Sequence, residues 1–180
     1  MALGVCRSVS WRRSASRIWV FGAAPIASSH AVSGAVVRHG GYVANFLGDG
    51  IIAYFGWPHA DEDNAAQAVR AGLDAIVAVR ELSLQAHAGI ASGPVVVGDL
   101  EAAGRRQTGA VVGETPNLAA RLEALAQPDQ VVIDGLTRQL IGAAFALEEG
   151  GPQSLKGFAE PVRAWRVVER ILISSSGDNE

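Results

Sequence analysis

From Val32 onward, hydrophobic residues follow a helical period in some stretches and a strand period in others. Between residues 61 and 80, apolar side chains recur every three or four positions behind a cluster of acidic residues, which predicts a long amphipathic helix. The stretch "AVSGAVVRHGG" predicts a helix that ends at Gly40 and Gly41. The stretch "VANFLGDGIIAYFG" predicts strands near 42–47 and 51–55 that form a hairpin.

The elements expected later in the chain are mostly shorter. "LQAHAGIASGPVVVGDL" and "AVVGE" predict strands joined by an exposed polar arm, "EAAGRRQTG". A helix near 115–126 follows, and then the strand "QVVID", the helix "LTRQLIG" and the strands "AFALEE" and "VRAWRVVE". This mixture indicates an α+β or α/β domain with helices covering a sheet. We expect the helices near 61–80 and 115–126 to pack on the same side of that sheet.

Asp49 lies between two glycines at the expected tip of the hairpin. An Asp-Gly pair between apolar runs is a strong turn signal, because glycine tolerates positive φ. The same tip would also hold one carboxylate rigidly at a sheet edge, where it could bind a metal ion. These fourteen residues alone leave both interpretations open.

The stretch "VVGETPNLAARLEALA" predicts a helix with Thr115 as its N-cap and Pro116 at its first position. Its expected buried stripe is Leu118, Leu122 and Leu125. Asn117 and Arg121 are four residues apart and therefore share a neighbouring face. A carboxamide and a guanidinium directed to one place suit a phosphate-bearing ligand, although an isolated pair of this kind also occurs on ordinary solvated faces.

Composition indicates one globular domain with a substantial core, because the chain has 180 residues, 49% of them hydrophobic, and a net charge of −3. Its apolar residues never form the roughly 18-residue run that a membrane-spanning helix requires. The single cysteine, Cys6, excludes an internal disulfide and a cysteine-rich zinc site, which suits a reducing compartment.

The N-terminal segment differs from the rest, because none of the 18 acidic residues precedes Asp49. Five arginines lie in the same stretch: Arg7, Arg12, Arg13, Arg17 and Arg38. Its Ser- and Arg-rich beginning fits a targeting peptide, a truncation or a misplaced start. We expect an atypical or poorly ordered segment over 1–30, one domain over 31–170 and a polar tail over 171–180. Residues 1–28 should pack poorly and leave neighbouring strands with an exposed edge.

Four stretches, in order, resemble the catalytic domain of class III adenylate/guanylate cyclases of the bacterial type. They are "GGYVANFLGDGIIAYFGWPHADEDNAAQAVRAGLDAI", "HAGIASGPVVVGDL", "AVVGETPNLAARL" and "LKGFAEPVRAWRV". Their order and spacing match the family's motifs from about Val32 to Val168.

The resemblance implies a ferredoxin-like α+β domain, with helices on a mostly antiparallel sheet, that dimerises head to tail around interfacial active sites. It implies that the ribose 3′-hydroxyl of a nucleoside triphosphate attacks the α-phosphate and releases pyrophosphate, assisted by two Mg²⁺ or Mn²⁺ ions. Asp49 matches a metal-binding aspartate, Asn117 the residue that orients the ribose, and Arg121 the residue that stabilises charge on the α-phosphate. Lys156 matches the region of a phosphate-contacting lysine.

The sequence departs from the family pattern at three positions. The family's first metal aspartate lies on an N-terminal strand, and no acidic residue upstream of Asp49 supplies it. The two positions that read the purine carry Asn45, in place of a lysine, and Ala110. ATP rather than GTP is the expected substrate, because the bacterial relatives that the chain most resembles look like adenylate cyclases.

Two functions therefore stay open: a nucleotidyl cyclase, acting as a homodimer or as a heterodimer with another cyclase domain, and a degenerate domain that only dimerises or binds nucleotide. The chain has no P-loop motif, and its histidines have no metal-ligand spacing. Its basic segment lacks interleaved aromatic residues, so we expect no nucleic-acid partner. A nucleoside triphosphate substrate implies a cytoplasmic location.

Overall fold

The computed structural model describes most of the chain outside its two ends. The described residues are 12–14, 17–23, 26–47, 50–57, 61–102 and 105–170.

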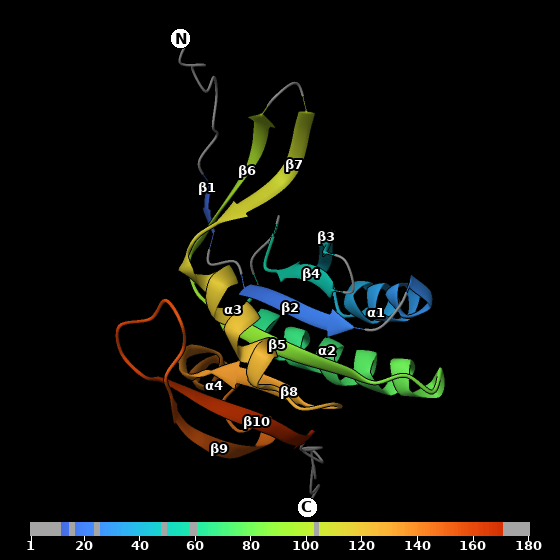
Figure 1. Ribbon diagram of the computed structural model, residues 1–180, viewed down its shortest axis with the longest axis vertical. Coiled ribbons are helices and arrows are strands. Elements are labelled where there is room, and N and C mark those ends of the chain that lie inside the picture. Colours follow the sequence, from blue (N-terminus) through green and yellow to red (C-terminus); the bar gives the residue numbers. More distant parts are fainter. Residues whose placement is uncertain are drawn as a thin grey trace, which may run out of the picture.

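The centre of the fold is a seven-stranded sheet with strand order β3-β4-β2-β5-β8-β10-β9 (Figure 1). Its strands are β2 (Arg17–Ala23), β3 (Tyr42–Leu47), β4 (Gly50–Phe55), β5 (Ala86–Ser92), β8 (Val131–Asp134), β9 (Phe145–Gln153) and β10 (Val162–Arg170). Every neighbouring pair is antiparallel except β5 and β8, which are parallel. The predicted α+β class with a mostly antiparallel sheet is confirmed.

A second, three-stranded sheet consists of β1 (Arg12–Ser14), β6 (Val95–Ala102) and β7 (Arg105–Val112), in the order β1-β6-β7. The β6 and β7 strands extend well away from the main sheet (Figure 1). Much of the predicted polar arm, "EAAGRRQTG", belongs to these strands, since Glu101 pairs with Arg106 and Ala102 with Arg105.

In the described part of the chain, four helices pack on the main sheet, and they cover both of its faces. They are α1 (Ile26–Arg38), α2 (Asn64–Glu81), α3 (Glu114–Leu125) and α4 (Gly135–Ile141). One buried cluster joins α1, α2 and α4 to strand residues that include Ala88 and Ile90, and a second joins α3 to Ala91 and Val132. The expectation that α2 and α3 share a face is therefore wrong. Small or apolar residues at successive positions of β5 let both faces of that strand be buried.

The N-terminal strand β2 lies in the middle of the main sheet rather than outside it. It pairs along its length with β4 and β5, so that Gly22 lies opposite Gly50 on one side and His87 on the other. The expected exposed edge is therefore wrong. The apolar run "RIWVFGA" has the β-branched and aromatic residues that favour strands, although no familiar motif marks it. The domain limits 1–30, 31–170 and 171–180 stay predictions, and 171–180 lie outside the described residues.

Helix α3 lies directly on the backbone of β5 at Gly89. A Cβ atom at Gly89 would lie 2.2 Å from the backbone nitrogen of Glu123 and 2.3 Å from the carbonyl oxygen of Ala119. Ala119 and Leu122 are fully buried, whereas the predicted third residue of the stripe, Leu125, is 37% exposed. The small Ala119 lets the helix approach the strand, which turns Leu125 towards solvent.

We expect Gly89→Ala to destabilise the domain by about 2–4 kcal/mol, because the new methyl group would meet rigid backbone atoms. Gly34→Ala in α1 is the matched control: its Cβ would meet only the end of the Arg38 side chain, at 3.4 Å, and alanine favours helix by about 0.5–1 kcal/mol. Urea unfolding of both variants measures the difference. Equal stability of Gly89→Ala and the parent chain would contradict the close approach.

Candidate functional site

The exposed side of α3 carries two of the predicted site residues, Asn117 and Arg121. The amide nitrogen Nδ2 of Asn117 donates to the Gly113 carbonyl oxygen at 3.4 Å. The Arg121 Nε donates to the carbonyl oxygen of Lys156 at 3.2 Å. Arg121 uses only Nε in this contact, so its two Nη groups are not part of it.

Lys156 lies in the loop between β9 and β10 and is exposed. The loop is anchored by Leu155, which is buried, and by the Phe158 N–H, which donates to the Leu155 carbonyl oxygen at 3.1 Å. Gly157 has a φ of +95°, a value that other residues rarely adopt. Arg121 thus contacts the backbone of a loop that lies 35 residues further along the chain. Its guanidinium and the ammonium group of Lys156 on that loop are the two candidates for binding an anion here.

The predicted N-cap role of Thr115 is wrong. Helix α3 begins one residue earlier, at Glu114, and Gly113 is its N-cap. The buried Thr115 hydroxyl instead donates to the Pro94 carbonyl oxygen at 3.1 Å, which ties the first turn of α3 to the connection between β5 and β6. A buried tertiary acceptor has replaced the local capping bond.

The purine-reading candidates lie on two different sheets. Asn45 is half-buried on β3, beside a register shift between Val43 and Asn45, and its Oδ1 accepts the Phe46 N–H at 2.9 Å. Its carboxamide therefore still offers the Nδ2 donors and one lone pair of Oδ1 to a ligand. Ala110 lies on β7, where its backbone pairs with Gly98.

Asp49 lies outside the described residues, but the residues on either side of it, Leu47 and Gly50, are described and pair with each other. Gly50 also lies opposite Gly22, which in turn lies opposite His87 near the start of β5. The first turn of α3 lies at the other end of β5 and about 20 Å away, because a seven-residue strand has that length. The hairpin and the Asn117 end of α3 therefore do not converge within one chain (Figure 1).

The described residues, which do not include Asp49, do not by themselves supply a two-ion metal site. Within the described ranges, no group of three or more His, Cys, Asp or Glu side chains could hold a metal ion. Strand β2 ends in Gly22 and Ala23 beside the hairpin, and neither residue carries a ligand group. Because no acidic residue precedes Asp49 in the sequence, a bridging carboxylate is missing on this side of the hairpin.

Two histidines, which the sequence pattern left without a role, pair with carboxylates. The His87 Nε2 on β5 lies 2.8 Å from Glu123 Oε1 on α3, and the His39 Nε2 lies 2.7 Å from Asp74 Oδ2 on α2. No local pattern could have revealed either pair, since the partners are more than 30 residues apart in the sequence.

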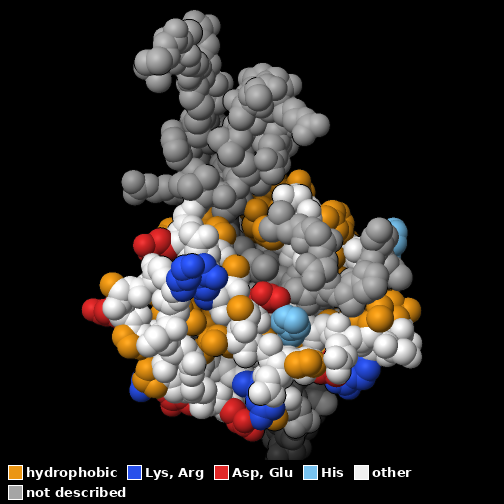
Figure 2. Space-filling model, viewed as in Figure 1, with side chains coloured by type: hydrophobic (Ala, Val, Ile, Leu, Met, Phe, Trp, Pro, Cys, Tyr) orange, Lys and Arg blue, Asp and Glu red, His pale blue; other side chains and the backbone are white. Residues whose placement is uncertain are grey.

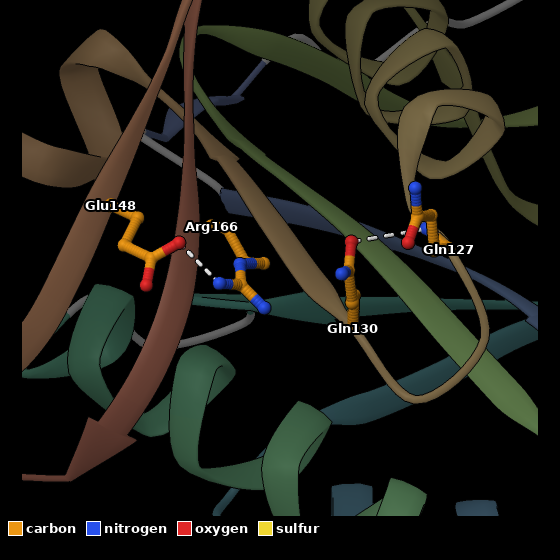
Figure 3. A network of polar contacts seen from close by, with 4 residues as sticks. All are labelled: Gln127, Gln130, Glu148 and Arg166. Carbon is orange, nitrogen blue, oxygen red and sulfur yellow. Dashed lines mark hydrogen bonds and ion pairs between the residues drawn. The ribbon is translucent and has the colours of Figure 1, made fainter.

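Two hollows among the described residues have linings that do not include these candidate residues. A cavity of about 520 Å³ lies between α4 and β10, over the ring of Trp165. Another, of about 440 Å³, lies between the C-terminal end of α3 and strands β8, β10 and β9. Figure 3 shows two polar contacts at the rim of this second hollow: the Gln127 N–H donates to Gln130 Oε1 at 3.2 Å, and Arg166 pairs with Glu148.

On the described part of the face in Figure 2, acidic and basic side chains are scattered.

Three aromatic residues gather near the edge of the sheet on the α3 face. The Tyr42 ring centroid lies 4.8 Å from that of Trp57 and 6.5 Å from that of Tyr54. Burial of Tyr54, and to a smaller extent the neighbouring Tyr42, raises the pKa of Tyr54 to about 12.

The chain belongs to the family described as the adenylate and guanylate cyclase catalytic domain, whose model matches residues 32–169. An uncharacterized protein from Rhizobium meliloti (strain 1021) is 34% identical over 143 residues, which are 74% of this chain and 14% of that relative. The chain thus spans about a seventh of that protein.

Solved structures of cyclases have the same fold. The adenylyl cyclase CyaB from P. aeruginosa aligns with a TM-score of 0.81 at 23% identity, over 91% of this chain and 98% of that one. The guanylyl cyclase Cya2 aligns with a TM-score of 0.74 at 26% identity, over 92% and 96%. In the part of the chain that the structure describes, no helix is long and apolar enough to cross a membrane.

The raised pKa of Tyr54 predicts a loss of stability at alkaline pH. The folded state holds the Tyr54 proton more tightly than the unfolded chain, whose tyrosine pKa is about 10. This stabilisation is complete below about pH 10 and is lost as the pH rises through about 12. Thermal unfolding between pH 9 and 12 should show a steeper decline for the parent chain than for Tyr54→Phe. Identical pH profiles would contradict the assignment.

Proposed function

We propose that this domain is a nucleotidyl cyclase subunit that converts a nucleoside triphosphate, preferably ATP, to the 3′,5′-cyclic monophosphate and pyrophosphate in intracellular signalling. The observation that carries the proposal is the hydrogen bond from Arg121 to the backbone of the loop that carries Lys156, one helical turn from Asn117. We place the protein in the cytoplasm, where such a substrate is available.

In the proposed reaction, the ribose 3′ oxygen bonds to the α-phosphorus while the bond from that phosphorus to the pyrophosphate oxygen breaks. The 3′-hydroxyl loses its proton to solvent, and pyrophosphate leaves with the electron pair of the broken bond. The Nη groups of Arg121 would stabilise charge that develops on the α-phosphate, and Lys156 would bind the departing phosphates. The carboxamide of Asn117 would hydrogen-bond the ribose and hold its 3′ oxygen in line.

The proposed active unit is a heterodimer. Asn117 lies near one end of β5 and Gly50 lies near the other, so two chains are needed if Asn117 and the residues next to Gly50 belong to one site. Two copies of this chain would duplicate the deficit in carboxylates, because a symmetric dimer repeats the same residues. A second cyclase chain that carries both family aspartates would complete one site.

The alternative function is a degenerate cyclase-like domain that dimerises or binds nucleotide without catalysis. It is favoured by the sequence before Asp49, which contains no acidic residue that could bridge two metal ions. The choice of ATP rests on the resemblance to bacterial adenylate cyclases. The Nδ2 donors of Asn45 suit either an adenine ring nitrogen or the guanine O6, so this residue does not discriminate strongly between the purines.

We expect the isolated chain to produce almost no cyclic AMP or cyclic GMP with Mg²⁺ or Mn²⁺ in the assay. Mixing it with an intact cyclase chain whose own Asn–Arg pair is disabled should restore one active site per heterodimer. Sustained turnover by the isolated chain would refute the heterodimer. Failure of the mixture, despite heterodimers demonstrated by size-exclusion chromatography, would favour the non-catalytic alternative.

In the active mixture, we expect Arg121→Ala to lower kcat on the order of 10²-fold with little change in KM, because the lost donors act on charge that develops in the transition state. Arg138→Ala removes an exposed arginine on α4, outside the candidate site, and is the matched control. Steady-state kinetics of both variants test this role. A raised KM with unchanged kcat for Arg121→Ala would contradict it.

A further inference from the structure

Helix α3 rests on a point of β5 that has no side chain. At Gly89 the two backbones meet, so no side chain of the strand fits between the residues of the helix. Interlocking side chains are what normally determine how a helix is rotated on its support. Contacts at the flanks of α3 therefore contribute to its rotation about its axis, in addition to the packing of Ala119 and Leu122 in the buried cluster.

Two polar contacts hold those flanks. Glu123 pairs with His87 on β5 at 2.8 Å, and Arg121 donates to the Lys156 carbonyl oxygen at 3.2 Å. Residues 121 and 123 are about 200° apart around a helix, so the two contacts pull on opposite sides of α3. The pair of His87 and Glu123 is partly buried, with side chains 32% and 21% exposed, and is therefore stronger than a fully solvated pair.

We propose that the His87–Glu123 pair positions α3 so that Arg121 reaches the Lys156 loop. Neither residue touches the proposed substrate site; His87 and Glu123 are positioning residues that act through Arg121. Their effect on phosphate binding rests on the proposed function, whereas their effect on the Arg121 contact does not.

The chain contains a matched control for this pair. His39 and Asp74 form the same type of contact at 2.7 Å, but they join the end of α1 to α2 on the opposite face of the sheet. Glu123 and Asp74 both lie within helices, where alanine is well tolerated. Each of the variants Glu123→Ala and Asp74→Ala therefore removes the carboxylate that pairs with a histidine. Only Glu123→Ala removes a contact of α3.

The decisive measurement is the exchange rate of the Arg121 Nε–H with solvent, followed by NMR of the 180-residue chain and assigned with Arg121→Lys. We expect Glu123→Ala to accelerate this exchange about tenfold, because the hydrogen bond to Lys156 opens more often. Asp74→Ala should leave the rate unchanged, although both variants should lower the melting temperature by about 1–3 °C. Glu123→Gln, which keeps an acceptor for His87, should stay within about twofold of the parent.

Calorimetric binding of inorganic triphosphate gives the second readout, with an expected loss of about tenfold for Glu123→Ala and no change for Asp74→Ala. Unchanged Arg121 exchange in a folded Glu123→Ala variant would overturn the inference. So would equal acceleration in Asp74→Ala. If the parent chain binds no triphosphate, the proposed function loses its phosphate site, and the exchange rates still decide the inference.

Discussion

The contact between α3 and the backbone of β5 at Gly89 is the constraint on which the rest of the candidate site depends. It lets the helix lie close enough for the Thr115 hydroxyl to reach Pro94, for Glu123 to reach His87, and for Arg121 to reach the β9–β10 loop. A side chain at that point would lift the helix and lengthen all three contacts together. The polar arrangement at the surface thus follows from the absence of a single Cβ atom in the core.

The two ends of the central strands carry different kinds of side chain. At one end, Asn117 and Arg121 lie on the exposed side of α3, and Arg121 contacts the backbone of the β9–β10 loop. The end with the β3–β4 hairpin adjoins a strand terminus of Gly22 and Ala23, and the sequence before Asp49 contains no acidic residue. Under the proposed function, such a chain is half of a composite site: its α3 end would bind phosphate, and another chain would supply the carboxylates.

Local signals predicted much of the fold, and tertiary packing explains where they failed. Gly40 ends α1 as expected, and the Asp134 side chain caps α4 by accepting the N–H groups of Leu136 and Thr137. The face of the sheet that each helix covers could not be predicted, because β5 carries apolar or small residues on both of its faces. Strand β2 was missed because the expected motif was absent, although its apolar residues favour a strand.

The candidate site, like the fold, was predictable from local signals but not where it depends on tertiary packing. Residue types and the resemblance to the cyclase family singled out Asn117, Arg121 and Lys156. No sequence pattern, however, links Arg121 to a loop 35 residues away or Glu123 to a histidine on a strand. Contacts of this kind arise only when the helix has docked, because they join elements that local propensity treats independently.

The central place of β2 also bears on how the chain folds during synthesis. This strand is made early, and it can pair with β4 after a few dozen further residues have emerged. Its other edge must wait for β5, since Arg17 lies opposite Ser92. Until then the growing chain carries a half-formed sheet with an open edge, which other chains or chaperones can contact before the sheet closes.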